Sequence, residues 1–524
     1  MSASKRLFAM KKINIFLASI ALVAAASCSD RLNIPQNGVL DESTYYKSDE
    51  DAAAAVAAAY ASLAGGSSIF TFEHVYKNVN GYLSDEYWPG QVDRTNALCQ
   101  LTSYTFDAND MYIEQYYSDL YSIIAKCNVV VDNIKGETAF QKQAVAEART
   151  LRAWSYFELT TLWGTPALVE HVSGDQPGNA TQAELWAFIE HDLSEAISSG
   201  AMSEKSSKYD RSNYRLTKQF AQAMLGKAYL WQGKNADAAK VLDEVIESEL
   251  YGLFSGSYGD MYDIPNENNE EVMFATNKLM DANNPSISYV PSFTGMSLYT
   301  RAALTMENPL DFPYFCFGGF SPRSDLYQAF VAEESADGYR LNESIKTYEY
   351  MAAAGYPIIA GAMENSEGFF QWKGRFLNPQ VEMYGIGYIT DRDIVWMRYA
   401  EVLLMAAEAN IGIDQTKADK YLNEVRHRAG LGDKTCTLEA IKTERRLELF
   451  GDFCRYKDLQ RWGDAASVLA TAGDKEPEFY STGVEWKSDR SGSGYKIGKH
   501  EYLPIPAAEL LINKNMNQTS SAWN

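Results

Sequence analysis

Two carboxylates one helical turn apart, Glu444 and Glu448, are the residues of this chain whose spacing could serve acid–base chemistry. A glycoside hydrolase needs such a pair facing a cleft, with the carboxyl groups about 5–9.5 Å apart. Here arginines crowd the pair, within the stretch ERRLELFGDFCRYKDLQRWG. Opposite charges at three- and four-residue steps pair along a helix face, so the spacing favours a structural ion network over a catalytic pair.

Other catalytic and metal-binding patterns give no stronger candidate. None of the five histidines lies in a zinc-binding pair, and the sequence has neither a serine nucleophile elbow nor a phosphate-binding glycine loop. The acidic residues in 107–110 and 391–393 could donate oxygens to calcium, but neither stretch fits the EF-hand loop, which favours turn and capping roles. We therefore expect no enzyme activity, no cofactor and no metal site.

Aromatic side chains in irregular stretches are better candidates for a site. A tryptophan or tyrosine ring offers a flat apolar face to the C–H face of a sugar, and its N–H or O–H can still form a hydrogen bond. Core packing is the alternative for any single ring. Glycine and proline turns beside Trp88, Phe317 and Phe320 should hold aromatic rings outward. The predicted ligand-binding residues are Tyr87, Trp88, Tyr289, Tyr299, Tyr314, Phe317, Phe320 and Trp372, with Trp88 and one or more of Tyr289, Tyr299 and Tyr314 stacking on the ligand.

The N-terminus has the pattern of a lipoprotein signal peptide. Four basic residues precede the apolar stretch 13–26, which is shorter than the ~20 residues of a membrane span. Small residues then lead to Cys28, the predicted lipidation site, so residues 1–27 should be removed. A plain signal peptide with an incidental cysteine is the alternative, and Met10 is an alternative start. The lipid would be the only attachment to a membrane.

The net charge and the cysteine content of the chain argue against a nucleic-acid partner and against a cysteine metal site. The formal net charge of −22 repels nucleic acid and anionic lipid head groups, so we expect no nucleic-acid partner. The five cysteines after Cys28 are odd in number and have no metal-ligand spacing. With 46% hydrophobic and 13% aromatic residues, the chain can bury a large core.

The most regular part of the chain is the stretch 393–463, where apolar spacing predicts three helices. Apolar or small residues from Ile394 and Met397 onward predict the first helix, Asp414 should cap the second, and Glu444, Glu448, Asp452 and Arg455 should line one face of the third. A second copy covers 215–246, because Leu422 aligns with Leu242 and Val425 with Val245. Gly226 lies where a tetratricopeptide-like pair needs a small residue.

The remaining segments divide the mature chain, which we expect to form a single body over 28–524. Its N-terminal part, 28–250, has helical patterns over 41–63, 111–134, 140–163 and 181–199, the last with a Thr181–Glu184 capping box. Residues 251–391 lack helical periodicity and should carry the ligand face. The third part, 392–524, holds the second repeat and an irregular tail whose Pro-x-Pro segment should dock back on the body.

An ordered series of motifs resembles the SusD/RagB family of outer-membrane nutrient-binding lipoproteins. It runs from NIPQNGVLDESTYY, through Tyr117, Tyr121, Ile124 and Asn128 on one helix, to LRAWSYFELTTLWGTP and SPRSDLYQAF, and on to YLNEVRHRAGL, ERRLELFGDFCRYKDLQRWG and LPIPAAE. Tyr117 departs from the family's tryptophan, Asp452-Phe453 from its Glu-Gly, and Lys514 from its proline. These departures concern packing and turns.

The resemblance implies a mainly α fold: a tetratricopeptide-like helical-repeat scaffold with a large irregular loop-rich region and a few short strands. It implies a lipid-anchored protein of the outer membrane, exposed at the cell surface, that passes a glycan to a SusC-like TonB-dependent transporter barrel. A peptide ligand is the alternative within the family. A lipid-anchored glycan hydrolase and a helical scaffold that binds only proteins are the alternatives outside it.

Overall fold

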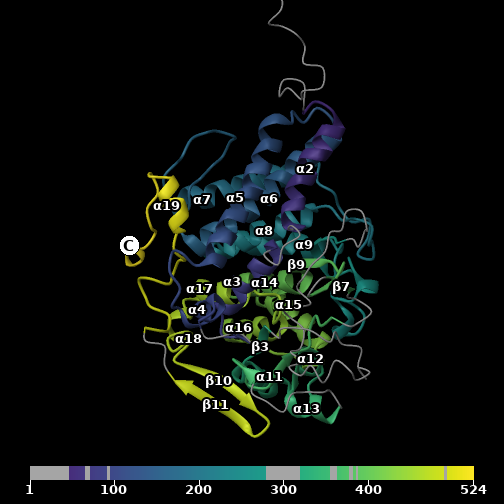
Figure 1. Cartoon of the computed structure of the whole chain (residues 1–524). Helices are drawn as coiled ribbons and strands as arrows, with labels where there is room; N and C mark the ends of the chain where they lie inside the picture. Colours follow the sequence, from purple (N-terminus) through teal and green to yellow (C-terminus); the bar gives the residue numbers. More distant parts are fainter. Residues whose placement is uncertain are drawn as a thin grey trace, which may run out of the picture. The chain divides into compact units, whose positions relative to one another are not determined.

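Helices make up most of the described chain, and its strands are short (Figure 1). The structure is a computed structural model, in which residues Asp49–Asn524 belong to one unit. The predicted fold class, a mainly helical scaffold with a few short strands, is confirmed. No helix within the described ranges is long and apolar enough to cross a membrane. These ranges are 46–64, 71–90, 95–278, 319–354, 363–376, 382–384, 387–488 and 492–524.

The helices predicted in the N-terminal part are present. Those over 111–134 and 140–163 are α5 (Met111–Asn133) and α6 (Ala139–Trp163). The capping box of α7 (Gln182–Ser198) forms in both directions, since Thr181 Oγ1 accepts from Glu184 N and the Glu184 carboxylate accepts from Thr181 N. The helix predicted over 41–63 is present from Asp49, and acidic residues occupy its first turn; residues 41–45 lie outside the described part of the chain. This first helix is α2 (Asp49–Ala64). Two shorter helices follow it, α3 (Phe72–Tyr82) and α4 (Ala97–Ser103).

Two helix pairs form the predicted repeats. A Cβ on Gly226 would lie 2.5 Å from the Leu242 side chain, so the close approach within the first pair requires glycine. Asp414 caps the second pair's second helix by accepting from Lys417 N at 3.1 Å. The first pair is α8 (Lys218–Trp231) with α9 (Asn235–Glu247), and the second is α14 (Tyr399–Asn410) with α15 (Gln415–Arg428). Helix α14 also packs on α9, which places the two repeats in contact.

The predicted helix over 393–410 is wrong in its first residues. Ile394 and Met397 lie in strand β9 (Ile394–Arg398), which pairs antiparallel with β2 (Val272–Thr276). The run Ile-Val-Trp-Met fits either a helix or a buried strand, and β2 supplies the backbone partner that decides the outcome. Trp396 Nε1 also donates to Thr276 Oγ1 at 2.6 Å. The helix starts one residue after the strand, at Tyr399.

The third helix of the predicted stack is also divided. Helix α16 (Leu438–Glu448) ends at Glu448, and α17 (Arg455–Trp462) begins after a tight turn. Gly451 and Phe453 both take left-handed backbone conformations in this turn, with φ of +83° and +60°. Asp452 and Arg455 therefore do not share a helical face with Glu444, contrary to the prediction. The turn nevertheless returns Asp452 to the same buried cluster as Glu448.

The middle of the chain contains short elements joined by irregular segments. Two short strand pairs carry or adjoin several of the predicted aromatic residues. Strand β1 (Tyr87–Pro89) pairs with β3 (Phe320–Pro322), and β4 (Ile345–Thr347) pairs with β6 (Phe369–Gln371). The others are the helices α11 (Ser324–Glu334), α12 (Tyr339–Ser344) and α13 (Tyr348–Ala353), the 3-10 turns η1 (Tyr258–Asp260) and η2 (Ile264–Asn266), and the strands β5 (Met363–Glu364), β7 (Glu382–Tyr384) and β8 (Gly387–Ile389).

The tail docks on the N-terminal helices, as predicted from its Pro-x-Pro segment. Trp163 Nε1 donates to Pro504 O at 3.0 Å, and Ala507 N donates to Ala108 O at 2.8 Å. The tail is less irregular than expected, because it includes an antiparallel hairpin. Its elements are α18 (Ala465–Val468), β10 (Lys475–Tyr480), β11 (Gly483–Ser488), α19 (Ala507–Ile512) and η5 (Ser521–Trp523).

Candidate functional site

Arg398 is the centre of a buried ion network. The end of β9 places its guanidinium between the β2 side of the fold and the turn after α16. Its Nη1 donates to Glu271 Oε1 at 2.5 Å and to Glu448 Oε1 at 3.0 Å, and its Nη2 donates to Asp452. The Arg398 side chain is almost completely buried, as are those of Glu271 and Glu448. The network is therefore shielded from solvent.

Two further arginines complete the charge balance around Glu448. Arg340, on α12, donates to Glu444 at 2.6 Å and to Glu448 at 3.1 Å, and Arg428, on α15, donates to Glu448 at 2.5 Å. Burial alone would raise the pKa of Glu448, but the guanidiniums of Arg428, Arg398 and Arg340 outweigh it and hold that pKa well below its usual range. Glu448 is thus a paired carboxylate, and the predicted structural network is confirmed.

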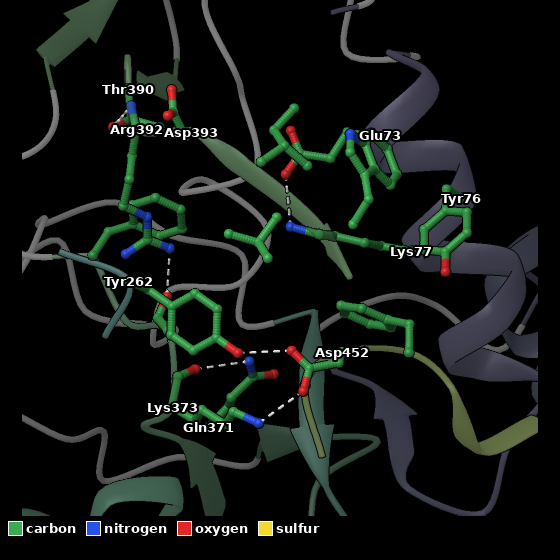
Figure 2. Close-up of a pocket in the computed structure, with 17 residues that line it drawn as sticks. Glu73, Tyr76, Lys77, Tyr262, Gln371, Lys373, Thr390, Arg392, Asp393 and Asp452 are labelled. Atoms are coloured by element: carbon green, nitrogen blue, oxygen red, sulfur yellow. Dashed lines mark hydrogen bonds and ion pairs between the residues drawn. The ribbon is translucent and has the colours of Figure 1, made fainter. Parts of the chain in front are cut away.

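A small polar hollow lies beside this network (Figure 2). Tyr262 Oη and Lys373 Nζ both point to Asp452 and donate to it, at 2.7 Å and 3.0 Å. Lys77 Nζ pairs with Glu73 at 2.6 Å on the other wall. The hollow encloses 60 Å³, whereas pockets that bury small ligands span about 300–1,000 Å³. It fits a packed polar junction better than a binding pocket.

Lys373 is a base in the hollow whose pKa is strongly lowered. Burial, with the charge of nearby Arg398, lowers its pKa to about 8, although Asp452 opposes the shift. A lysine with such a pKa can act as a nucleophile when it is free. Here the ammonium group is engaged, because Nζ also donates to Glu448 O at 2.8 Å. Lys373 therefore connects the segment after β6 to Glu448 and to the turn after α16.

The structure corrects the predicted orientation of three aromatic residues. Tyr87, Trp88 and Phe320 are buried, and Trp88 is only 5% exposed. Strands β1 and β3 pair directly here, so the glycine and proline turns do not hold these rings outward as expected. Trp88 Nε1 donates to Glu367 Oε1 at 2.7 Å, and the Arg323 guanidinium lies 3.9 Å from the Trp88 ring centroid. We call these five residues the Trp88 core.

The other predicted positions divide into two groups. Trp372 is described and half-buried. Tyr289, Tyr299, Tyr314 and Phe317 lie outside the described residues, as do Cys28 and the predicted signal peptide over 1–27. Lipidation of Cys28 and contacts of these four rings with a ligand therefore stay predictions.

Trp372 belongs to a cluster of aromatic and basic residues, of which only Trp372 was predicted from the sequence. Tyr350, on α13, is 46% exposed, and its ring meets Trp372 edge-on with centroids 6.3 Å apart. Lys346 Nζ lies 4.2 Å from the Tyr350 centroid, and the Arg375 guanidinium lies 4.8 Å from that of Trp372. We call these four residues the Trp372 cluster. A signal for Tyr350 was available, since YEY opens a short helical pattern beside a glycine- and proline-containing segment.

The acidic stretches considered for calcium accept hydrogen bonds from backbone N–H groups. Asp110 Oδ1 caps α5 by accepting from Tyr112 N and Ile113 N, at 3.0 Å and 3.1 Å. Asp393 accepts from Lys278 N at 3.0 Å. Within the described ranges, no group of three or more histidine, cysteine, aspartate or glutamate side chains is arranged to hold a metal ion.

Comparisons with known proteins cover nearly the whole chain. A family model described as "SusD family" matches residues 314–523, and one described as "Starch-binding associating with outer membrane" matches residues 40–230. A SusD-like protein of Bacteroides ovatus is 25% identical over 87% of this chain and 83% of its own length. The starch-binding protein SusD of Bacteroides thetaiotaomicron is 24% identical over 84% of both chains.

Solved structures show the same fold. A laminarin-binding SusD-like protein superposes with a TM-score of 0.74, at 26% identity, over 90% of this chain and 99% of its own. Surface glycan-binding protein A of Bacteroides thetaiotaomicron, solved in complex with laminarihexaose, gives a TM-score of 0.72 at 23% identity, over 89% of this chain and 98% of its own. The shared fold therefore covers about nine-tenths of the chain.

Proposed function

Because this chain belongs to the SusD/RagB family, we propose that it captures an oligosaccharide or polysaccharide nutrient by non-covalent binding. The observation that carries this proposal is the near-complete superposition on a laminarin-binding SusD-like protein. The paired carboxylates support binding over hydrolysis. Glu444 and Glu448 are held by arginines in the interior, where they cannot face a substrate.

The Trp372 cluster is the proposed stacking surface among the described residues. Tyr350 is 46% exposed and Trp372 is half-buried, so the open parts of these rings can pack on the C–H faces of sugars. The half-buried Arg375 can donate to sugar hydroxyls. Tyr289, Tyr299, Tyr314 and Phe317 extend the proposed ligand face. Peptide is the alternative ligand.

A glycan and peptide array with the purified chain tests the ligand class, followed by titration of the strongest binder into Trp372→Ala. We expect about tenfold weaker binding, since a lost stacking contact of ~1.4 kcal/mol is a factor of ten. Tyr214→Ala is a matched control, because Tyr214 is 53% exposed and lies outside the cluster. Binding of peptides alone, or release of new reducing ends from a bound glycan, would replace this proposal with one of its alternatives.

The proposal includes a lipid anchor on Cys28, a single mature body over 28–524 at the outer-membrane surface, and delivery to a TonB-dependent transporter barrel. Mild detergent extraction of the tagged protein should co-purify a large β-barrel in near-equal amount. Cys28→Ala should abolish membrane retention. Repeated recovery of the protein alone argues against the transporter, and normal membrane retention of the variant argues against the anchor.

A further inference from the structure

A larger groove is lined by residues of α9, α12 and α15. Figure 1 labels these three helices to the right of its centre. The volume of the groove is 960 Å³, at the upper end of the range for small-ligand pockets. The segment before α8 and the segment after α9 form its other walls. It shares no residue with the Trp372 cluster or with the Trp88 core. We call it the α15 groove.

Two exposed tyrosines flank the α15 groove. Tyr209 is 63% exposed and Tyr339 is 44% exposed, which is unusual for such large rings on the same depression. The Tyr339 hydroxyl accepts from Tyr258 N at 2.8 Å, so its ring is held in position. Lys208 Nζ lies 5.1 Å from the Tyr209 ring centroid. The groove therefore presents aromatic surface that the fold does not cover.

Polar groups that the fold leaves unpaired line the same groove. Tyr399 lines it, and its hydroxyl forms no hydrogen bond with any part of the chain that the structure describes. Arg428 Nε is buried and equally unpaired, although both of its Nη atoms are engaged with carboxylates. Buried polar groups in proteins nearly always have partners. One buried, unpaired donor beside an unpaired tyrosine hydroxyl points to a polar ligand.

The charges of the groove balance one another. Lys208 and Lys420 face Glu249 and Glu424, and the charge of Arg428 is neutralised by its buried carboxylates. Glu424 is half-buried but forms no ion pair with the described residues, not even with Lys420 one turn earlier on α15. Burial raises its pKa above the ordinary value. A strongly anionic ligand would meet two carboxylates here, and an apolar ligand would desolvate four charged side chains.

From these contacts we infer that the α15 groove is a second binding site, for a neutral oligosaccharide. Sugar hydroxyls both donate and accept, so they can pair with the Tyr399 hydroxyl and with the Glu424 carboxylate. The C–H faces of the sugar rings would stack on Tyr209 and Tyr339. This inference rests on the proposed glycan-binding function and adds a location that the aromatic pattern of the sequence did not indicate.

Isothermal titration calorimetry with neutral hexaoses, namely laminarihexaose, maltohexaose, cellohexaose and xylohexaose, tests the inference. For the hexaose that binds, we expect two molecules per chain in the wild type and one in Tyr209→Ala/Tyr399→Phe. Tyr399→Phe alone keeps the ring and should weaken the second site at least fivefold with an unchanged melting temperature. Tyr214→Ala, in the same connecting segment but outside the groove, should keep both sites.

The outcomes separate this inference from the function on which it rests. One hexaose per chain, lost in Trp372→Ala and unchanged in the groove variants, overturns the second site and leaves glycan binding intact. No binding of any neutral glycan, on the array or in calorimetry, overturns both. Tighter groove binding of a hexauronate than of the neutral hexaose overturns the assignment to neutral sugars.

Discussion

The Trp88 core and the α15 groove are built from the same kinds of residue but pair their polar groups differently. In the Trp88 core, the indole N–H is bonded to Glu367, and Arg323 covers the ring. In the α15 groove, Tyr209 is exposed, and the Tyr399 hydroxyl has no partner within the described chain. Aromatic residues next to charges therefore indicate a binding surface only where the surrounding structure leaves rings uncovered and polar groups unpaired.

The largest loss of stability should follow from a substitution in the ion network around Arg398. Arg398→Ala leaves Glu271, Glu448 and Asp452 buried without their shared cation, and we expect a loss of about 3–5 kcal/mol in unfolding free energy. Urea unfolding followed by tryptophan fluorescence measures it. Arg211→Ala is the control, because Arg211 is exposed and its side chain donates to Pro265 O, a backbone acceptor outside the network. Equal losses in the two variants would contradict a structural role specific to the network.

Trp88→Ala should lower the unfolding free energy by about 3 kcal/mol, because it leaves a cavity and removes one hydrogen-bond donor from Glu367. Affinity for the glycan should not change. Calorimetry and urea unfolding on the same preparation measure the two quantities. A tenfold loss of affinity with unchanged stability would instead restore the sequence-based prediction that Trp88 stacks on the ligand.

A pH-dependent effect should distinguish the interior beside Trp88 from the groove. Burial, aided by the charge of Asp85, raises the pKa of Glu86 from 4.5 to about 8. The folded state therefore keeps a proton that the unfolded state releases, so this contribution to stability is complete below pH 4.5 and is lost as the pH rises towards 8.

Glu86→Gln should remove that contribution to the pH dependence. Relative to the wild type, we expect the variant to gain about 3 kcal/mol between pH 5 and pH 8. Urea unfolding of both proteins at pH 5, 6.5 and 8 measures the difference in their unfolding free energies. The titration of all other groups cancels in this difference. Parallel pH profiles would show that Glu86 is ionised in the folded protein.

The smallest effect on stability should come from the groove. Tyr209→Ala removes a side chain that is 63% exposed, so the unfolding free energy should stay within about 0.5 kcal/mol of the wild type. The same thermal or urea measurement on Tyr214→Ala provides the matched comparison. A loss above ~2 kcal/mol in Tyr209→Ala alone would mean that Tyr209 belongs to the packed interior, and the two regions would then no longer differ.

Local patterns in the sequence determined the helical scaffold. The helices α5, α6 and α7, the capping box at Thr181 and the cap at Asp414 were all predicted, because helical periodicity and caps depend on residues within a few positions. The close spacing of acidic and basic residues around Glu444 and Glu448 likewise predicted an ion network. The ordered motifs also identified the family.

Tertiary structure alone decided which residues meet across long separations. Strand β9 forms because β2, more than a hundred residues earlier, supplies its backbone partner, and the same holds for β1 and β3, whose pairing buries Trp88. Arg398 and Glu271 join the network through that first pairing. The α15 groove combines segments before α8, after α9 and on α15. Its unpaired hydroxyl and carboxylate could not be found from the sequence, because whether a polar group has a partner depends on every segment packed around it.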